Sequence, residues 1–502
     1  MPDKLPEDVL QKLEQHGLCV GQKGKVDWRD DAPAHPKNWP LRRKLYDTGI
    51  ISLFATISGL TGNVGTSVAR EATTDFGISP VLANIAFASM YFYGQAVGGL
   101  VVPPYTESFG RKNTNLLATA SFAIACIIVG APQSLPAVFV GRFATGFISA
   151  LPQVVGSGMI EDMWGVRARI WAIDIWIKGS IVGIALGPCM ATYVSLSNLH
   201  WPWVFYICAI LSAVNCFLCL WTQESRPSVL LNRQVEAVQR ETDTHDLETE
   251  NQDRVPNFRT FAHTMLIRPA QWFFTEPIVC VVALMSGVIF SSLYLQTEGL
   301  AVTYAYEEFG FNEHQASLVY IAWIIGLVLT VPLRLNDWRI VSRRLRRNEK
   351  VRPEDKITGF YVAAPVLAAA LWWFAWTVPP AVNGISPFVS IAALLFVGAC
   401  TNEFDGILQG YLTDSYTAYA ASANASLAFL RAILSGSFPI FSRQMFKNLG
   451  SNIATSILAI IATLFCGIAL WFMKYGAQFR EKSKYAVSME DDEDEKKDDQ
   501  QK

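Results

Sequence analysis

The chain has 502 residues, of which 51% are hydrophobic and 17% are charged, with a formal net charge of −2 at pH 7. Soluble proteins usually contain about 25% charged residues, and nucleic-acid-binding proteins are usually strongly basic. The composition therefore argues against a soluble enzyme, and we expect no nucleic-acid partner. Charged residues gather at 1–44, 224–268, 337–356 and 480–502, and long apolar stretches lie between them.

The N-terminal segment, 1–45, is polar and lacks the apolar stretch of a signal peptide. We expect it to be cytosolic, with the first membrane span as the targeting signal. Six apolar stretches follow, and each is long enough to cross a bilayer core of about 30 Å as a helix. The predicted spans lie at 46–68, 81–102, 114–132, 138–160, 168–194 and 202–221, so the N-terminal six-helix half covers 46–221.

A polar central loop at 222–274 separates this half from a second one, and its part from Gln234 to Asp253 reads as disordered because it is acidic and poor in aromatic residues. The C-terminal six-helix half covers 275–473, and an acidic cytosolic tail occupies 474–502. The spans predicted in the second half lie at 275–297, 314–334, 358–378, 387–411, 420–444 and 452–473.

Lysine and arginine show which side of the membrane each loop occupies. Arg111 and Lys112 follow the second span, Arg167 and Arg169 follow the fourth, and a cluster of cations follows the eighth at 339–356. Cytosolic loops carry the excess of Lys and Arg, so both termini and the central loop are predicted to be cytosolic. The predicted fold class is an all-α integral membrane protein with twelve transmembrane helices in two six-helix halves.

A loop motif follows the second span and begins at Gly98. It continues through Glu107 to Gly110, Arg111 and Lys112. The glycine at position 110 suits a tight turn, and we expect the two cations to pair with Glu107 and so to form a latch that differs between two conformations. The alternative is a loop whose cations only set the orientation. This motif resembles the signature loop of major facilitator transporters, and in particular that of the fungal twelve-span drug:proton antiporters.

Two further motifs lie inside predicted spans. Arg142 and Gly146 in the fourth span are similar to the arginine-x-x-x-glycine motif that this family uses in proton coupling, although Arg142 could instead extend to the outer interface. Gly183, Gly187 and Pro188 in the fifth span match the core of the family's exporter motif, and small residues of this kind allow close helix packing. Asp174 stands where that motif has its leading glycine.

Three carboxylates inside predicted spans are the remaining candidates for proton or substrate coupling: Asp174, Glu403 and Asp405. Asp174 and Lys178 are four residues apart on one helix and are expected to pair. Glu403 and Asp405 are two residues apart, about 200° around a helix, so they cannot both face one cavity. Glu403 is the first choice for a carboxylate that binds a proton or a cation.

The resemblance implies a proton-coupled secondary transporter that exports a small organic compound, such as a secondary metabolite, a toxic compound or a polyamine, by alternating access. Two alternatives stay open: an uptake or organelle carrier for organic acids or biosynthetic precursors, and a non-transporting receptor on the same scaffold. No catalytic or cofactor motif occurs in the sequence, so we expect no enzyme activity and no cofactor besides a proton gradient. We expect a monomer in a lipid bilayer, in the plasma membrane or alternatively in the vacuolar or peroxisomal membrane.

Overall fold

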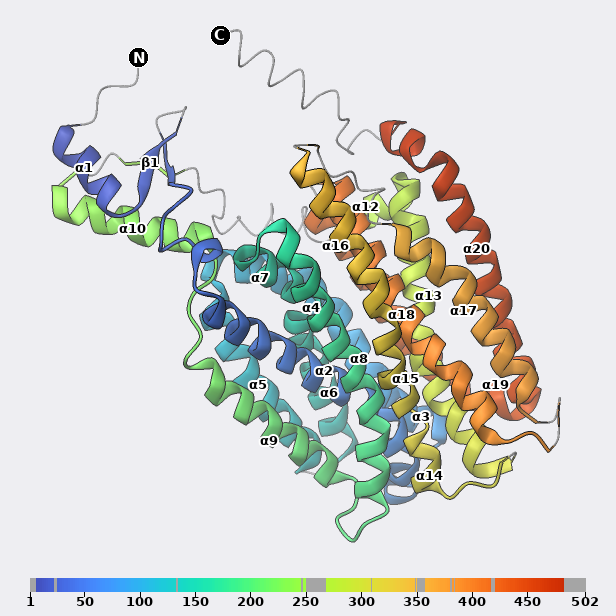
Figure 1. The fold of residues 1–502 in the computed structure, drawn as a ribbon. Helices are drawn as coiled ribbons and strands as arrows, with labels where there is room; N and C mark the ends of the chain where they lie inside the picture. Colours follow the sequence, from blue (N-terminus) through green and yellow to red (C-terminus); the bar gives the residue numbers. More distant parts are fainter. Residues whose placement is uncertain are drawn as a thin grey trace.

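The computed structural model describes residues 6–21, 25–131, 134–244, 247–249, 268–307, 309–347, 349, 357–379, 382, 384–416 and 420–482. Long helices run side by side through the molecule (Figure 1). The short helix α1 and the helix α10 lie beyond one end of this bundle, which we call the α10 side. The short helix α14 lies at the other end, which we call the α14 side.

The first half contains six helical runs, and two of them include a π-helical turn, at Ile85–Ser89 and at Leu151–Val155. Each π turn shifts the helix face by one residue without interrupting the run. The helices are α2 (Leu41–Phe76), α3 (Pro80–Asn84) continued by α4 (Met90–Phe109), α5 (Arg111–Gly130), α6 (Leu135–Ala150) continued by α7 (Gly156–Met163), α8 (Val166–Ser195) and α9 (Pro202–Cys219).

The second half begins with the short helix α12 (Arg268–Thr275) and also contains six long helical runs. One run joins three helices through a 3₁₀ turn at Leu327–Thr330, and the first run ends in a π-helical turn at Val302–Glu307. The helices are α13 (Pro277–Ala301), α14 (Glu313–Leu318) with α15 (Ile321–Gly326) and α16 (Val331–Arg346), α17 (Thr358–Thr377), α18 (Pro387–Ser415), α19 (Ala420–Leu449) and α20 (Ser451–Lys482).

Eleven of these runs, within the described residues, are long and apolar enough to cross a membrane. The remaining predicted span is α2, which has 36 residues and is therefore about 54 Å long. Its hydropathy is lower because small and polar residues occupy its centre, and Ser58, Thr61 and Asn63 are fully buried against other helices. The prediction of an all-α membrane protein with twelve spans in two halves is confirmed.

The two halves repeat the same helix neighbours. In the first half α2 packs on α8, α4 packs on α6 and α5 packs on α9. In the second half the equivalent pairs are α13 with α19, α15 with α18 and α17 with α20. The halves meet through α4 against α19 and through α8 against the run α14 to α16. Such an internal repeat places a binding site at the interface between its two copies.

Close packing of α2 on α8 depends on the predicted glycine motif. A Cβ atom at Gly183 would overlap the carbonyl oxygen of Thr56, and one at Gly187 would lie 2.9 Å from the carbonyl oxygen of Leu60. Pro188 lies inside α8, one residue after this contact. The backbones of the two helices therefore approach one another directly, as small residues allow in membrane helices.

A small unit on the α10 side joins the N-terminal segment to the central loop. It consists of α1 (Glu7–Gln15), an antiparallel pair of strands, β1 (Leu18–Val20) and β2 (Val26–Trp28), and α10 (Pro227–Thr242). The predicted disorder of 234–253 is therefore wrong over the part that belongs to α10. Leu231, Val235 and Val238 recur at helical spacing and pack on α1 and the strands. This apolar face stabilises α10, although the average composition of the segment is acidic and polar. The acidic run 490–502 lies outside the described residues.

Candidate functional site

A cavity of about 440 Å³ lies between the two halves on the α10 side. On the first half its wall is formed by α4, α7 and α8, and on the second half by α16, α18 and α19. Apolar side chains such as Ile173 and Ile177 face charged and polar ones such as Arg334 and Gln409. Its volume and mixed lining are those of a site for a small organic molecule.

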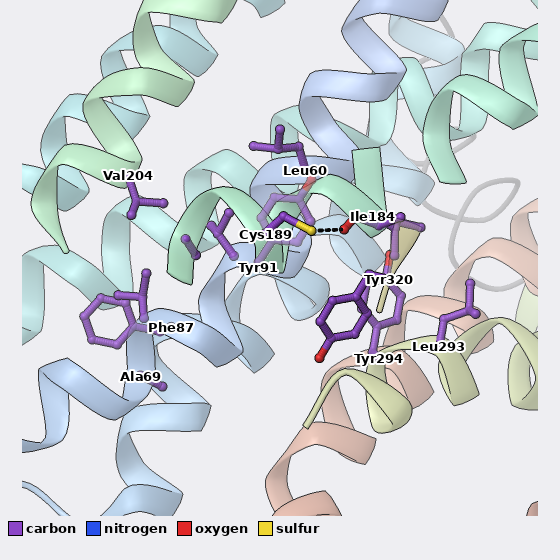
Figure 2. Packing of buried hydrophobic residues seen from close by; sticks show 14 of the residues in the cluster. Leu60, Ala69, Phe87, Tyr91, Ile184, Cys189, Val204, Leu293, Tyr294 and Tyr320 are labelled. Carbon is purple, nitrogen blue, oxygen red and sulfur yellow. Dashed lines mark hydrogen bonds between the residues drawn. The ribbon is translucent and has the colours of Figure 1, made fainter. Parts of the chain in front are cut away.

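The halves are closed against one another on the α14 side. Figure 2 shows Leu293, Tyr294 and Tyr320 of the second half in one buried cluster with Cys189 and Ile184 of the first half. Polar contacts across the interface join Asn63 to Thr297 (3.2 Å), Arg70 to Glu298 (3.9 Å) and Cys189 to the carbonyl oxygen of Ser317 (2.8 Å). A cavity on one side and a closed interface on the other are the features of one end state of alternating access.

A buried cluster of charges lies beside the inner wall of the cavity. Its centre is Arg334 of α16, which lies 2.5 Å from Glu403 of α18, 3.2 Å from Asp337 and 3.3 Å from Asp174 of α8. Lys178 is 2.6 Å from Asp174, as its spacing predicted. Glu403 is 1% exposed and Asp174 is 4% exposed, so water screens these charges weakly.

The arrangement makes Arg334 a shared partner of the two halves. It pairs with Glu403 inside its own half and with Asp174 of the other half. When one of these carboxylates is protonated, its attraction for the guanidinium falls. Arg334 then interacts mainly with the carboxylate that remains charged. A single proton can therefore change the strength of a contact between the halves, which is the chemistry that proton coupling needs.

Asp405 faces away from this cluster, as its position two residues after Glu403 requires. It pairs with Arg431 of α19 at 2.6 Å and accepts a hydrogen bond from Ser286 of α13 at 3.4 Å. Arg431 also lies over the ring of Phe290. The two carboxylates of α18 thus serve separate ion pairs, and the coupling role predicted for each stays a prediction.

Arg142 is fully buried inside the first half. Its guanidinium donates hydrogen bonds to the carbonyl oxygens of Phe87 (2.5 Å), Thr61 (2.8 Å) and Gly62 (3.3 Å), and it lies 4.8 Å from the centre of the Tyr91 ring. The alternative, an arginine that extends to the outer interface, does not describe this side chain. Arg142 joins α2, the π turn before α4 and α6, and its role in proton coupling remains a prediction.

The glycines at positions 98 and 146 explain how α4 and α6 come so close. A Cβ atom at Gly98 would overlap the carbonyl oxygen of Phe147, and one at Gly146 would overlap that of Tyr91. These two glycines therefore bring the helix that carries Arg142 against the helix that leads into the latch motif.

The latch motif forms different pairs from those predicted. Gly110 adopts φ 90°, and the chain turns sharply there into α5. Arg111 then points towards α7, where its guanidinium lies 3.1 Å from Asp162 and donates to Thr106 Oγ1. The expected pair of Glu107 with Arg111 or Lys112 is thus corrected to Arg111 with Asp162, because the turn directs Arg111 away from Glu107. Among the described side chains, Glu107 instead lines the cavity.

Sequence reasoning missed three charged residues. Arg334 and Asp162 form the ion pairs described above, and the carboxylate of Glu224 accepts hydrogen bonds from the backbone N–H groups of Arg111 and Lys112. Arg334 is the last residue of the predicted eighth span, but the helix continues to Arg346 and leaves Arg334 three turns inside it. The signal that could have found it is a single cation in an apolar stretch. Asp162 and Glu224 carried no such signal, because both follow spans whose ends are ordinarily polar.

Residues 50–439 match the family model described as Major Facilitator Superfamily. The efflux pump radE of Floropilus chiversii is 28% identical over 470 residues, which cover 92% of this chain and 86% of that protein. The multidrug transporter TPO1_2 of Candida glabrata is 28% identical over 461 residues, covering 91% and 78%. The cercosporin MFS transporter CTB4 of Cercospora nicotianae is 28% identical over 484 residues, covering 95% and 92%.

Solved structures agree on the fold. The proton:xylose symporter XylE aligns with a TM-score of 0.60 at 16% identity and covers 87% of this chain and 96% of its own. The human organic anion transporter MFSD10 aligns with a TM-score of 0.59 at 14% identity, covering 86% and 100%. The family model that matches residues 50–439 establishes that the chain belongs to the Major Facilitator Superfamily of membrane transporters, as its resemblance to the fungal drug:proton antiporters indicated.

Proposed function

We propose that this transporter exports a small organic compound in exchange for protons by alternating access. Its cavity is closed on the α14 side and lies on the α10 side, which the distribution of Lys and Arg predicts to be cytosolic. A compound would enter from the cytosol in this state. We further propose that the protein acts as a monomer in the plasma membrane.

The observation that carries the proposal is the sharing of Arg334 between Asp174 and Glu403. This contact is buried, lies beside the cavity and crosses the interface between the halves. Protonation of either carboxylate weakens one side of the shared contact, so uptake of a proton favours a different arrangement of the halves. Binding of the substrate and binding of the proton would then favour opposite steps of the transport cycle.

The direction of transport rests on the relatives. Several are named as efflux pumps or multidrug transporters, among them radE, TPO1_2 and FLU1 of Candida albicans. CTB4 is named as a transporter of cercosporin. These names support export of a small organic compound, and the resemblance of the sequence to the fungal antiporters adds its substrate classes to the proposal: a secondary metabolite, a toxic compound or a polyamine. The exposed apolar wall of the cavity suits a compound with an apolar body.

The test uses purified protein in liposomes that contain a pH-sensitive dye. A panel of polyamines, drugs and organic acids is added under an imposed pH gradient. The parent protein is compared with Glu403→Gln and Asp174→Asn. Glu236→Gln is the matched control, because Glu236 lies on α10 outside the bundle and its side chain is 62% exposed. We expect a compound that moves protons in the parent and in the control, with proton flux falling to that of empty liposomes in Glu403→Gln.

The outcomes separate the parts of the proposal. Proton flux that survives in both Glu403→Gln and Asp174→Asn would remove the coupling role of this cluster. A labelled compound that equilibrates across the membrane without proton flux would leave a carrier and remove the coupling. If compounds bind in the cavity but none crosses the membrane, the transporter proposal fails in favour of a receptor.

A further inference from the structure

A second hollow lies on the α10 side, outside the cavity between the halves. It has a volume of about 670 Å³ and lies between the segment before α2, the start of α5 and the first turns of α10. Trp39 and Leu230 form its apolar wall, and Lys112 and Arg233 line it from α5 and α10. The transport cycle proposed above makes no use of it.

The hollow carries positive charge that the described residues do not neutralise. Lys112 and Arg233 form no ion pair within the described part of the chain. One carboxylate, Glu224, also lines the hollow, but it is 5% exposed. Its oxygens accept hydrogen bonds from the backbone N–H groups of Arg111 (2.7 Å), Lys112 (3.1 Å) and Arg226 (3.0 Å), so Glu224 serves the start of α5 and is a poor partner for a cation in the hollow.

Amide groups add further hydrogen-bond donors to this surface. Asn113 and Gln223 both line the hollow, and each has an NH₂ group. Two cations and two amides on separate elements favour a compact anion with several acceptor oxygens. Phosphate groups are of this kind, and Lys and Arg are their usual partners.

The length of the neighbouring spans favours a membrane lipid as the source of a phosphate in this hollow. The span α5 has 20 residues and begins at Arg111, which is just the length of the hydrocarbon core. Its first residues, including Lys112, therefore lie at the level of the lipid headgroups. Gln223 follows the end of the neighbouring span α9, which ends at Cys219, and lies at the same level. Trp39 adds an aromatic side chain of the type enriched at this interface.

We propose that this hollow binds the phosphate-bearing headgroup of an anionic membrane lipid, with Lys112 and Arg233 on the phosphate and Trp39 and Leu230 against the glycerol and the upper acyl chain. Anionic lipids are concentrated on the cytosolic leaflet, which is the side that we propose for α10. Because the hollow joins the N-terminal segment and α10 to the latch loop, the lipid would hold these three elements together.

The test measures lipid retention by native mass spectrometry of the full chain, purified with phosphatidic acid, phosphatidylinositol or phosphatidylcholine. Lys112→Gln, Arg233→Gln and the double variant are compared with Arg240→Gln, a cation on α10 that pairs with Glu236 and does not line the hollow. We expect the parent and Arg240→Gln to retain the two anionic lipids over phosphatidylcholine. Each single variant should bind them about fivefold more weakly, and the double variant should show no preference. Thermal unfolding midpoints check that the variants are folded.

Three results would overturn the proposal. The first is unchanged retention of anionic lipid in the folded double variant. The second is complete displacement of the lipid by inorganic phosphate or glycerol phosphate, which would make the hollow a site for a soluble anion. The third is anionic-lipid binding that appears only when the acidic residues of 490–495 are replaced by their amides, which would make the acidic tail the occupant.

Discussion

Asp174 of α8 and Arg334 of α16 form a charged contact, 3.3 Å long, between the two halves of the transporter. Arg334 is 12% exposed and also binds Glu403 at 2.5 Å. The contact lies beside the inner wall of the cavity, where the two halves must separate or slide for the opposite state to form. In the proposed cycle, protonation of one of these carboxylates would weaken its contact with the guanidinium and so change the contact between the halves.

Replacing Arg334 by glutamine should destabilise the protein strongly. The change leaves buried carboxylates without their guanidinium, and removal of one partner of a buried ion pair costs about 3–5 kcal/mol. Scanning fluorimetry in detergent should show a lower unfolding midpoint. Adding Glu403→Gln to Arg334→Gln should recover part of the loss, because it removes one of the buried negative charges that Arg334→Gln leaves without a partner. A double variant no more stable than the single one would contradict the assigned pairing.

Gly183→Ala should separate α2 from α8, because the added methyl group would overlap the Thr56 carbonyl oxygen. Overpacking of this kind costs about 1–3 kcal/mol. Gly49→Ala, in α2, is the matched control, since no atom lies within 4 Å of its added methyl group, and alanine is favoured over glycine in a helix by roughly 0.5–1 kcal/mol. The unfolding midpoint should fall for Gly183→Ala and hold or rise for Gly49→Ala. Equal midpoints would show that these helices have room to move apart.

Arg142→Lys should destabilise the protein, although it preserves the positive charge. The guanidinium reaches three carbonyl oxygens, those of Phe87, Thr61 and Gly62, and one ammonium cannot take the same planar geometry. Each buried acceptor left without a donor costs about 1–3 kcal/mol. We expect a lower unfolding midpoint for Arg142→Lys and a similar fall for Arg142→Met. Full stability of Arg142→Lys would mean that charge alone is needed at this position.

A disulfide between Asn63→Cys and Thr297→Cys should hold the α14 side closed. The Oγ1 atom of Thr297 and the Oδ1 atom of Asn63 are 3.2 Å apart and belong to different halves, so the two side chains meet across the closed interface. Oxidation should stop substrate movement in liposomes, and a reductant should restore it. Each single cysteine variant under the same oxidant is the control. Normal transport by the fully crosslinked protein would rule out opening of this interface during the cycle.

The local pattern of the sequence determined the course of the chain through the membrane. Apolar stretches of span length located all twelve long helical runs, because satisfying backbone hydrogen bonds inside lipid leaves a helix as the only open-chain solution. The glycine spacing from Gly183 to Gly187 indicated a close contact, since only one face of a helix carries both residues. The positions of Glu403 and Asp405 determined that they face different neighbours, because the helical period is a local property.

Only the tertiary structure decided which charges pair between different helices. Arg111 binds Asp162 instead of Glu107, and Arg334 of α16 joins Glu403 of α18 to Asp174 of α8. Likewise, the apolar stripe of α10 became an ordered unit because α1 and two short strands cover it. Hydropathy and helical spacing indicate whether a segment spans the membrane and which of its residues share one face. They do not indicate which other helix packs against that face. The energy of a buried charge depends on its partner from that other helix.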